Sequence, residues 1–133
     1  MHWIEQPILE QLGQDAGEEL LPQLVTIFIE DGQKNLAELE QALRRRDAEQ
    51  LLLLAHTLKS VCATYGAMVC HEEAQRLEQA CRQSNWSQME QLVAALQQSL
   101  PATSQALLAS LAEPHWHRRA CPTNPWQTLP AYP

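Results

Sequence analysis

The stretch from Asp47 to Gly66 constrains the fold of this chain most, because its apolar residues repeat with the period of an α-helix. At about 100° per residue, His56 falls roughly 160° from Leu58 around the helix axis. Asp47 is suited to cap the start of this helix, and Gly66 suits the left-handed residue that ends one. We expect a helix that presents a histidine on one side and buries a stripe on the other, made of Leu51, Leu54, Leu58, Val61 and Tyr65.

The composition favours an all-helical domain. The chain has 133 residues, which suits one domain with a hydrophobic core, and 45% of them are apolar while 19% are charged. Leu, Ala, Gln and Glu dominate, and these residues are strong helix formers. The sequence therefore predicts an all-α fold.

Further segments with helical periodicity surround this stretch, and the connections between the long ones are short. Short connections between helices favour antiparallel neighbours. We predict an antiparallel up-down four-helix bundle with a short N-terminal helix and an irregular Pro-rich C-terminal tail. The predicted elements are a short helix at 3–12 ended by Gly13, a long helix reaching Arg46, the helix at 47–66, a helix at 68–84, and a last helix starting near Asn85.

Prolines leave two helix boundaries open and mark a tail. Pro22 either starts the long second helix or kinks it, and Pro101 kinks or interrupts the last one. Residues 113–133 hold five of the eight prolines and show no helical period. We therefore divide the chain into a domain at 1–112 and a tail at 113–133, which is either disordered or anchored on an apolar groove by Trp116, Trp126 and Tyr132.

Charge and hydropathy exclude several classes of function. The formal net charge is −7, which argues against nucleic-acid binding because phosphate backbones require basic surface. The run Arg44, Arg45 and Arg46 falls at a predicted helix C-terminus, where positive charge complements the helix dipole. No apolar stretch is long enough to span a membrane, and the N-terminus lacks the segments of a signal peptide. We expect a cytoplasmic protein.

The metal-ligand residue types do not form a recognisable metal site. No two cysteines form a CxxC pair, and most occupy apolar helix positions, so we expect small buried side chains. His115 and His117 have an HxH spacing without further ligands nearby. We predict no metal site and no disulfide for the four cysteines, Cys62, Cys70, Cys81 and Cys121.

An exposed histidine beside a lysine points to phosphoryl chemistry. Neutral imidazole is a nucleophile, and Lys59, one turn beyond His56, can reach the oxygens of a phosphoryl group on the ring. Exposed leucines and small side chains near a reactive residue suit a flat protein partner better than a small molecule. The predicted partner surface consists of Leu52, Leu53, Ser60 and Ala63.

The run His56-Thr57-Leu58-Lys59-Ser60, with Gly66 ten residues after the histidine, resembles the signature of histidine-containing phosphotransfer (HPt) domains. The resemblance extends over roughly residues 5–112. Ser60 departs from the glycine that commonly follows the lysine in that family, although serine is also small.

The resemblance implies a role for each matching residue. His56 would accept the phosphoryl group on its outer ring nitrogen, Lys59 would be its charge partner, and Gly66 would end the helix and border the partner surface. The partners would be receiver domains of response regulators or hybrid sensor kinases. The chain would need no cofactor, because the receiver supplies Mg²⁺, and it would be a monomeric phosphoryl carrier without kinase activity of its own.

Two questions stay open from sequence. Glu78 and Arg82 lie on the helix expected beside His56; Arg82 is a candidate for the partner surface, but an ordinary solvated residue is the favoured interpretation of both. An adaptor or inhibitor that binds a kinase or response regulator without transferring phosphate is the alternative function. Loss of His56 or Lys59 would favour that alternative, and both are present.

Overall fold

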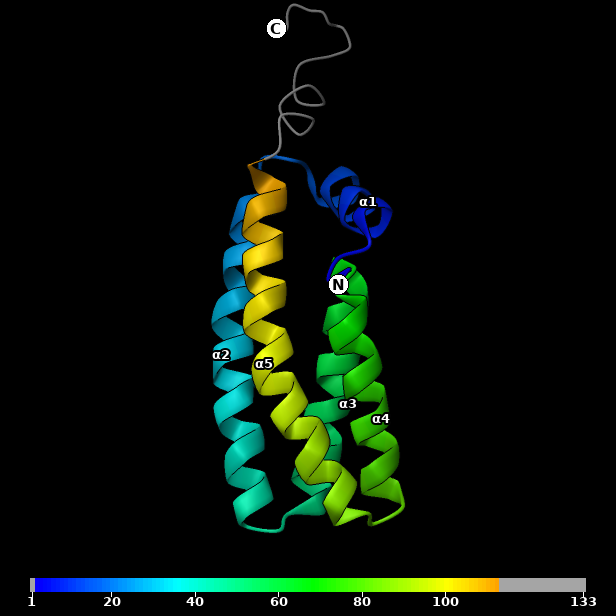
Figure 1. Ribbon diagram of the computed structural model, residues 1–133. Coiled ribbons are helices and arrows are strands. Elements are labelled where there is room, and N and C mark those ends of the chain that lie inside the picture. Colours follow the sequence, from blue (N-terminus) through cyan, green and yellow to red (C-terminus); the bar gives the residue numbers. More distant parts are fainter. Residues whose placement is uncertain (1, 113–133) are drawn as a thin grey trace, which may run out of the picture.

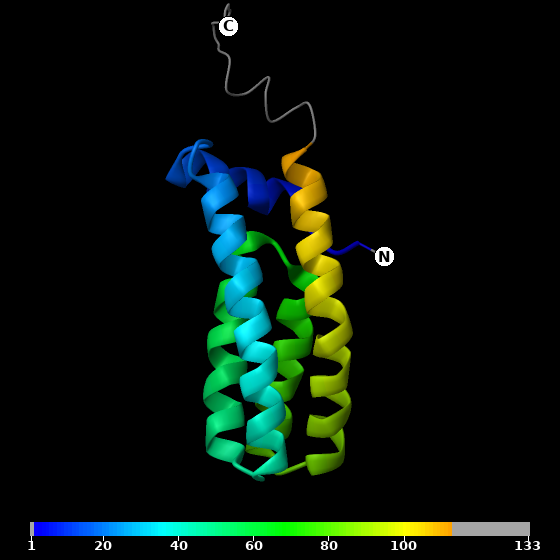
Figure 2. The same cartoon turned by 90° about the vertical axis from the view of Figure 1, so that its left-hand side faces the viewer.

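The computed structural model describes residues 2–112, which form five helices and no strand. Four long helices make an antiparallel bundle, and the short α1 lies across one end of it (Figures 1 and 2). Packing is most extensive between α3 and α4, then between α4 and α5 and between α2 and α5, so the helices follow chain order around the bundle. The predicted fold is confirmed, with helices α1 Gln6–Ala16, α2 Leu21–Arg44, α3 Ala48–Tyr65, α4 Met68–Arg82 and α5 Trp86–Leu111.

The predicted boundaries of the first helix are wrong. Gly13 lies inside α1 and is buried, and Gly17 follows the helix with a φ of 96°. Gly13 is tolerated within the helix because it faces the rest of the protein, where packing outweighs the weak helix propensity of glycine. The end of α1 therefore falls at the second glycine, where the backbone adopts a conformation that other residues rarely take.

The two prolines left open by the sequence have different positions. Pro22 lies in the first turn of α2, where its missing N–H has no helical partner to lose. Pro101 lies inside α5, and the helix continues past it to Leu111. Figure 1 shows a bend in α5, and an interior proline is a common cause of such a bend.

Both predicted caps of α3 are confirmed. The Asp47 side chain accepts a hydrogen bond of 3.1 Å from the Gln50 backbone N–H, and Gly66 has a φ of 76°. Gly66 is also covered by the N-terminal segment, because its carbonyl accepts a 2.8 Å hydrogen bond from the Glu5 backbone N–H. The helix that carries His56 is thus held firmly at both ends.

The predicted buried stripe of α3 is correct in three positions and wrong in two. Leu54 and Val61 are only partly buried, whereas Ala55 and Cys62, one position further along, are fully buried. Both α2 and α4 pack against α3, so the buried stripe is the face that lies between them. The observed buried set is Leu51, Ala55, Leu58, Cys62 and Tyr65.

The predicted burial of three cysteines and the predicted place of the arginine run at a helix end are confirmed. Cys62, Cys70 and Cys81 are buried free thiols. Arg44 lies in the last turn of α2, and the Arg46 guanidinium stacks 4.4 Å from the Trp86 ring centroid. Cys121, the His115 and His117 pair and the predicted tail at 113–133 lie outside the described residues.

Candidate functional site

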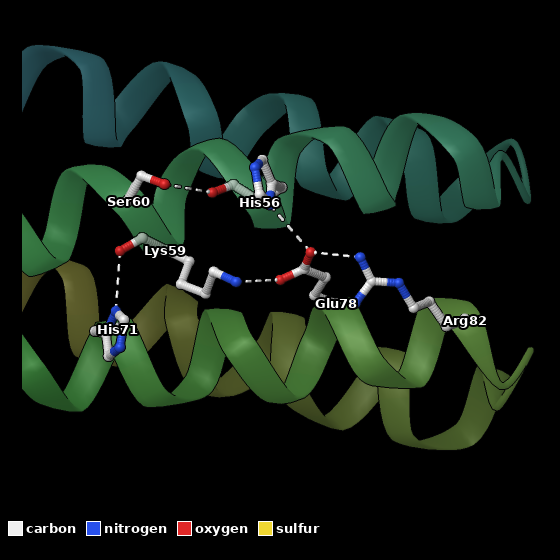
Figure 3. A network of polar contacts seen from close by, with 6 residues as sticks. All are labelled: His56, Lys59, Ser60, His71, Glu78 and Arg82. Atoms are coloured by element: carbon white, nitrogen blue, oxygen red, sulfur yellow. Dashed lines mark hydrogen bonds and ion pairs between the residues drawn. The ribbon is translucent and has the colours of Figure 1, made fainter.

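His56 occupies the outward side of α3, next to α4. Its side chain is 60% exposed, as the helical phase predicted. Figure 3 shows Glu78 of α4 lying between three basic side chains, those of His56, Lys59 and Arg82. The first two come from α3 and the third from α4, so the site is built by the most extensive helix pair of the bundle.

Glu78 is the centre of this cluster. Its side chain is only 4% exposed, and both carboxylate oxygens are engaged. Oε1 accepts from Lys59 Nζ at 2.8 Å, while Oε2 accepts from an Arg82 guanidinium nitrogen at 2.9 Å and lies 3.1 Å from His56 Nδ1. A buried carboxylate requires such partners, since an unpaired charge away from water is strongly unfavourable.

These contacts keep Glu78 ionised. The hydrogen bond from Lys59 is the largest cause that lowers the pKa of the Glu78 carboxyl, to about 2, and the His56 bond and the Arg82 charge add to it. Burial acts in the opposite direction but is outweighed. The carboxylate therefore carries a negative charge throughout the physiological pH range.

The ionised carboxylate determines which nitrogen of His56 is available. A carboxylate can only accept hydrogen bonds, so the neutral imidazole opposite it carries its proton on Nδ1. The lone pair then belongs to Nε2, the nitrogen on the far side of the ring. A histidine held in this way presents Nε2 as a nucleophile to an approaching partner.

Two further hydrogen bonds near His56 involve backbone carbonyls of α3. The Ser60 hydroxyl donates to the His56 carbonyl at 3.3 Å, and is therefore occupied by the helix itself. His71 Nδ1 lies 3.0 Å from the Lys59 carbonyl, to which it donates, so the first turn of α4 is attached to α3 beside the lysine. His71 lies in an early turn of α4, and this hydrogen bond gives it a structural role.

A shallow depression of about 330 Å³ opens beside the histidine. It brings two of the predicted partner residues of α3, Leu52 and Leu53, together with Glu78 and Arg82 of α4. Leu53 is 60% exposed there, whereas Leu52 is partly buried against the core. Its lining residues are Glu49, Leu52, Leu53, His56, Glu78 and Arg82.

Gly66 was predicted to belong to the partner surface, but it does not line this depression. It is buried, and a Cβ at this position would lie 2.7 Å from the Glu5 carbonyl oxygen. Its place is explained by the backbone turn after α3 and by the N-terminal segment that covers it. Ser60 is exposed and Ala63 partly so, one and two turns beyond His56 on the same side of the helix.

Glu78 is the site residue that sequence reasoning undervalued. It is buried rather than solvated, which corrects the favoured interpretation of this residue. One signal was available: Glu78 follows Leu77 within the apolar positions of α4, between Ala74 and Cys81. Arg82 is exposed, but it is held to Glu78 and is not an independent surface charge.

The described residues form neither a metal-binding cluster nor a membrane-spanning helix. Among residues 2–112, no group of three or more His, Cys, Asp or Glu side chains is placed to hold a metal ion. Within the same described range, no helix is long and apolar enough to cross a membrane.

Comparison with known proteins identifies the family. The family model described as the Hpt domain matches residues 23–106, which include the whole histidine cluster. The chain belongs to the Hpt domain family. This Hpt domain acts in histidine phosphotransfer within a phosphorelay, and receiver domains are the partners of the family.

Two solved structures share the fold of this Hpt domain. Histidine-containing phosphotransfer protein B (HptB) from Pseudomonas aeruginosa PAO1 matches with a TM-score of 0.77 and 21% identity, over 82% of this chain and 94% of that one. The HPT domain of a sensor hybrid histidine kinase from Shewanella matches with a TM-score of 0.69 and 15% identity, over 84% and 95% of the two chains. A search of the curated proteins finds no match.

Proposed function

We propose that His56 is the residue that carries the phosphoryl group, and that Glu78 orients it. The observation that supports this proposal is the 3.1 Å contact between His56 Nδ1 and a carboxylate that is already ionised. The other ring nitrogen is thereby left free on a largely exposed side chain. In phosphoryl transfer most of the catalysis comes from positioning and electrostatics, so a rigidly held imidazole suffices on this side of the reaction.

The step proceeds as a displacement at phosphorus. The Nε2 lone pair of His56 attacks the aspartyl phosphate of a receiver domain, the bond between phosphorus and the aspartate oxygen breaks, and the receiver carboxylate leaves. The ring then bears the phosphoryl group on Nε2 and keeps its Nδ1 proton, whose positive charge Glu78 stabilises at 3.1 Å. The reverse displacement passes the group to another receiver.

Lys59 is the proposed charge partner of the phosphoryl group. In the resting site its ammonium group binds Glu78 at 2.8 Å, and its side chain is 26% exposed. A phosphoryl group of roughly two negative charges competes with Glu78 for this cation. Lys59 then bridges the buried carboxylate and the phosphoryl oxygens, which requires only a rotation of its flexible side chain.

The receiver domain is proposed to dock over Leu53 and the depression beside His56. We expect it to supply the Mg²⁺ ion, so that this chain needs no cofactor of its own. For the whole chain, we expect a monomer that resides in the cytoplasm and binds no nucleic acid.

A transfer assay tests the assignment of His56. A receiver domain charged with labelled phosphate by a small phosphodonor is mixed with the native chain, with His56→Ala, or with His71→Ala. Acid-labile, alkali-stable label is expected on the native chain and on His71→Ala, and not on His56→Ala. Label on His56→Ala would assign the chemistry to another residue. Absence of label from the native chain, with receivers that bind it, would favour a non-transferring adaptor.

A further inference from the structure

A second surface of the molecule lies on the opposite side of the bundle from His56. It is a groove between α2 and α5 with a volume of about 190 Å³. Neither helix that forms it contributes to the histidine cluster, which belongs to α3 and α4. The residues that line the groove are Ile29, Gly32, Gln33, Leu36, Leu100, Pro101, Ser104, Gln105 and Leu108.

The groove is mostly apolar: its polar lining residues are Gln33, Ser104 and Gln105, and no charged side chain lines it. Leu108 is 51% exposed at its edge, which is unfavourable for a large aliphatic side chain in water. Gly32 lies on its floor, where a Cβ would come no closer than 3.9 Å to Leu100, so the lack of a side chain deepens the groove. Such a surface favours an occupant that brings apolar side chains and no charge.

The chain itself contains a segment of that composition. Residues 120–133 have no charged side chain, four prolines, and Trp126, Leu129 and Tyr132 as large apolar side chains. Each proline lacks a backbone N–H, so this segment brings fewer donors that an apolar groove would leave unpaired. Arg118 and Arg119 precede the segment and can stay in water.

The geometry of the chain brings this segment to the groove. Figure 1 shows α5 ending at the α1 end of the bundle, beside α2. The α5 residues in the groove, Leu100 to Leu108, precede Ala112 by 4 to 12 positions, which is about 6–18 Å along a helix. Residues 113–119 span up to ~23 Å when extended, so they can turn back and deliver residue 120 to the groove.

We propose that residues 120–133 bind the groove between α2 and α5 of the same molecule, with Trp126 as the anchor. The proposal is independent of the phosphotransfer site, because the groove lies across the bundle from α3 and α4. The segment covers Leu108 and its neighbours while the surface around His56 stays open to receivers. Disruption of this contact therefore leaves phosphoryl transfer unchanged.

The native Cys121 allows a direct test in the full-length chain. The other cysteines are buried, so a nitroxide reagent under native conditions labels Cys121 selectively. Paramagnetic broadening is then measured on backbone amide signals of the bundle. We expect signals of Gln33, Ser104 and Leu108 to lose more than half of their intensity, whereas those of Gln50 and Gln91, at the far end of the bundle, keep theirs.

Matched variants identify the surface that is bound. Leu108→Asp places a charge in the groove and is expected to abolish the broadening. Ile27→Asp is the control, because Ile27 lies outside the groove lining on α2 and is equally exposed, at 50% against 51%. Trp126→Ala removes the anchor from the segment and is also expected to abolish the broadening. All three variants are expected to transfer phosphate like the native chain.

Three results would overturn the proposal. Weak and uniform broadening over the whole surface would show that the segment has no site. Strong broadening around Leu53 would place it on the receiver surface. The third result comes from a mixture of two samples: spin-labelled chain without isotope enrichment, and isotope-enriched chain without spin label. Broadening that persists in this mixture would mean that a second copy provides the segment.

Discussion

The Lys59 ammonium group lies 2.8 Å from Glu78 Oε1, so the cation next to His56 is already neutralised by a buried carboxylate. An incoming phosphoryl group must therefore compete for this lysine. On the proposed function, the negative charge of Glu78 has two opposing effects: it stabilises the protonated ring of phosphohistidine, and it repels the phosphoryl oxygens and withholds Lys59 and Arg82 from them. The following predictions separate these effects.

Replacement of Glu78 by glutamine is expected to shift the transfer equilibrium toward phosphorylated His56. Glutamine has nearly the same size and can still accept hydrogen bonds, but it releases the charge of Lys59 and Arg82 to the phosphoryl group. We expect the free energy of transfer to change by about 1 kcal/mol, which is roughly fivefold in the equilibrium constant between receiver and histidine. The ratio of labelled receiver to labelled histidine at equilibrium measures it. Glu72→Gln, an exposed position on the same helix that pairs with Arg76, is the control and should leave the ratio unchanged.

The low pKa of Glu78 predicts how folding stability depends on pH. Its folded value of about 2 lies below the ordinary 4.5, so between these values the unfolded chain binds the proton and the native one does not. The contribution of the Glu78 carboxylate to folding stability is therefore fully present above about pH 4.5 and is lost as the pH falls toward 2. Urea unfolding of the native chain and of Glu78→Gln at several pH values measures their free energies of unfolding. The difference between the two free energies should shrink as the pH falls across this range. A constant difference would contradict the assignment.

Lys59→Ala is expected to slow transfer roughly tenfold and to destabilise the fold by about 1–2 kcal/mol, between the effects of an exposed ion pair and of a buried charge left alone. Helicity should be unchanged, because Lys59 lies at the edge of the packed surface. The stability loss is expected to shrink in the double variant Lys59→Ala with Glu78→Gln, which removes both charges. Strict additivity of the two single effects would mean that Lys59 and Glu78 are not coupled.

The sequence was sufficient to predict the display of His56, because helical phase is a local property. The apolar spacing lies within α3, and Asp47 and Gly66 lie directly at its two ends. Each of these features acts on residues that are close to it in the sequence. The family resemblance then assigned roles to His56 and Lys59 that the pattern alone does not contain.

Glu78 could not be predicted in the same way. A glutamate on a helix is usually solvated, and its burial here depends on how closely α4 packs against α3. That distance depends on the side chains of both helices, which include the fully buried Ala55 and Ala74. The end of α1 was missed for a related reason, since the burial of Gly13 depends on contacts with distant parts of the chain.

Gly66→Ala is expected to destabilise the bundle by about 2–4 kcal/mol. The positive φ of 76° disfavours a side chain by roughly 1–2 kcal/mol, and the added Cβ would lie 2.7 Å from the Glu5 carbonyl oxygen, which is backbone and must move. Chemical denaturation of Gly66→Ala and of the native chain measures the loss. A loss of no more than about 1–2 kcal/mol would leave backbone conformation as the whole explanation.

Leu53→Asp is expected to weaken receiver binding at least tenfold without changing stability. Leu53 is 60% exposed beside His56, so an aspartate there stays hydrated in the free chain but disrupts an apolar contact with the receiver. Leu52→Asp is the informative comparison, because Leu52 also packs against the core and its replacement should lower the unfolding free energy as well. Titration with a receiver domain and thermal unfolding of both variants measure the two properties. Native affinity in Leu53→Asp would move the receiver surface away from this end of α3.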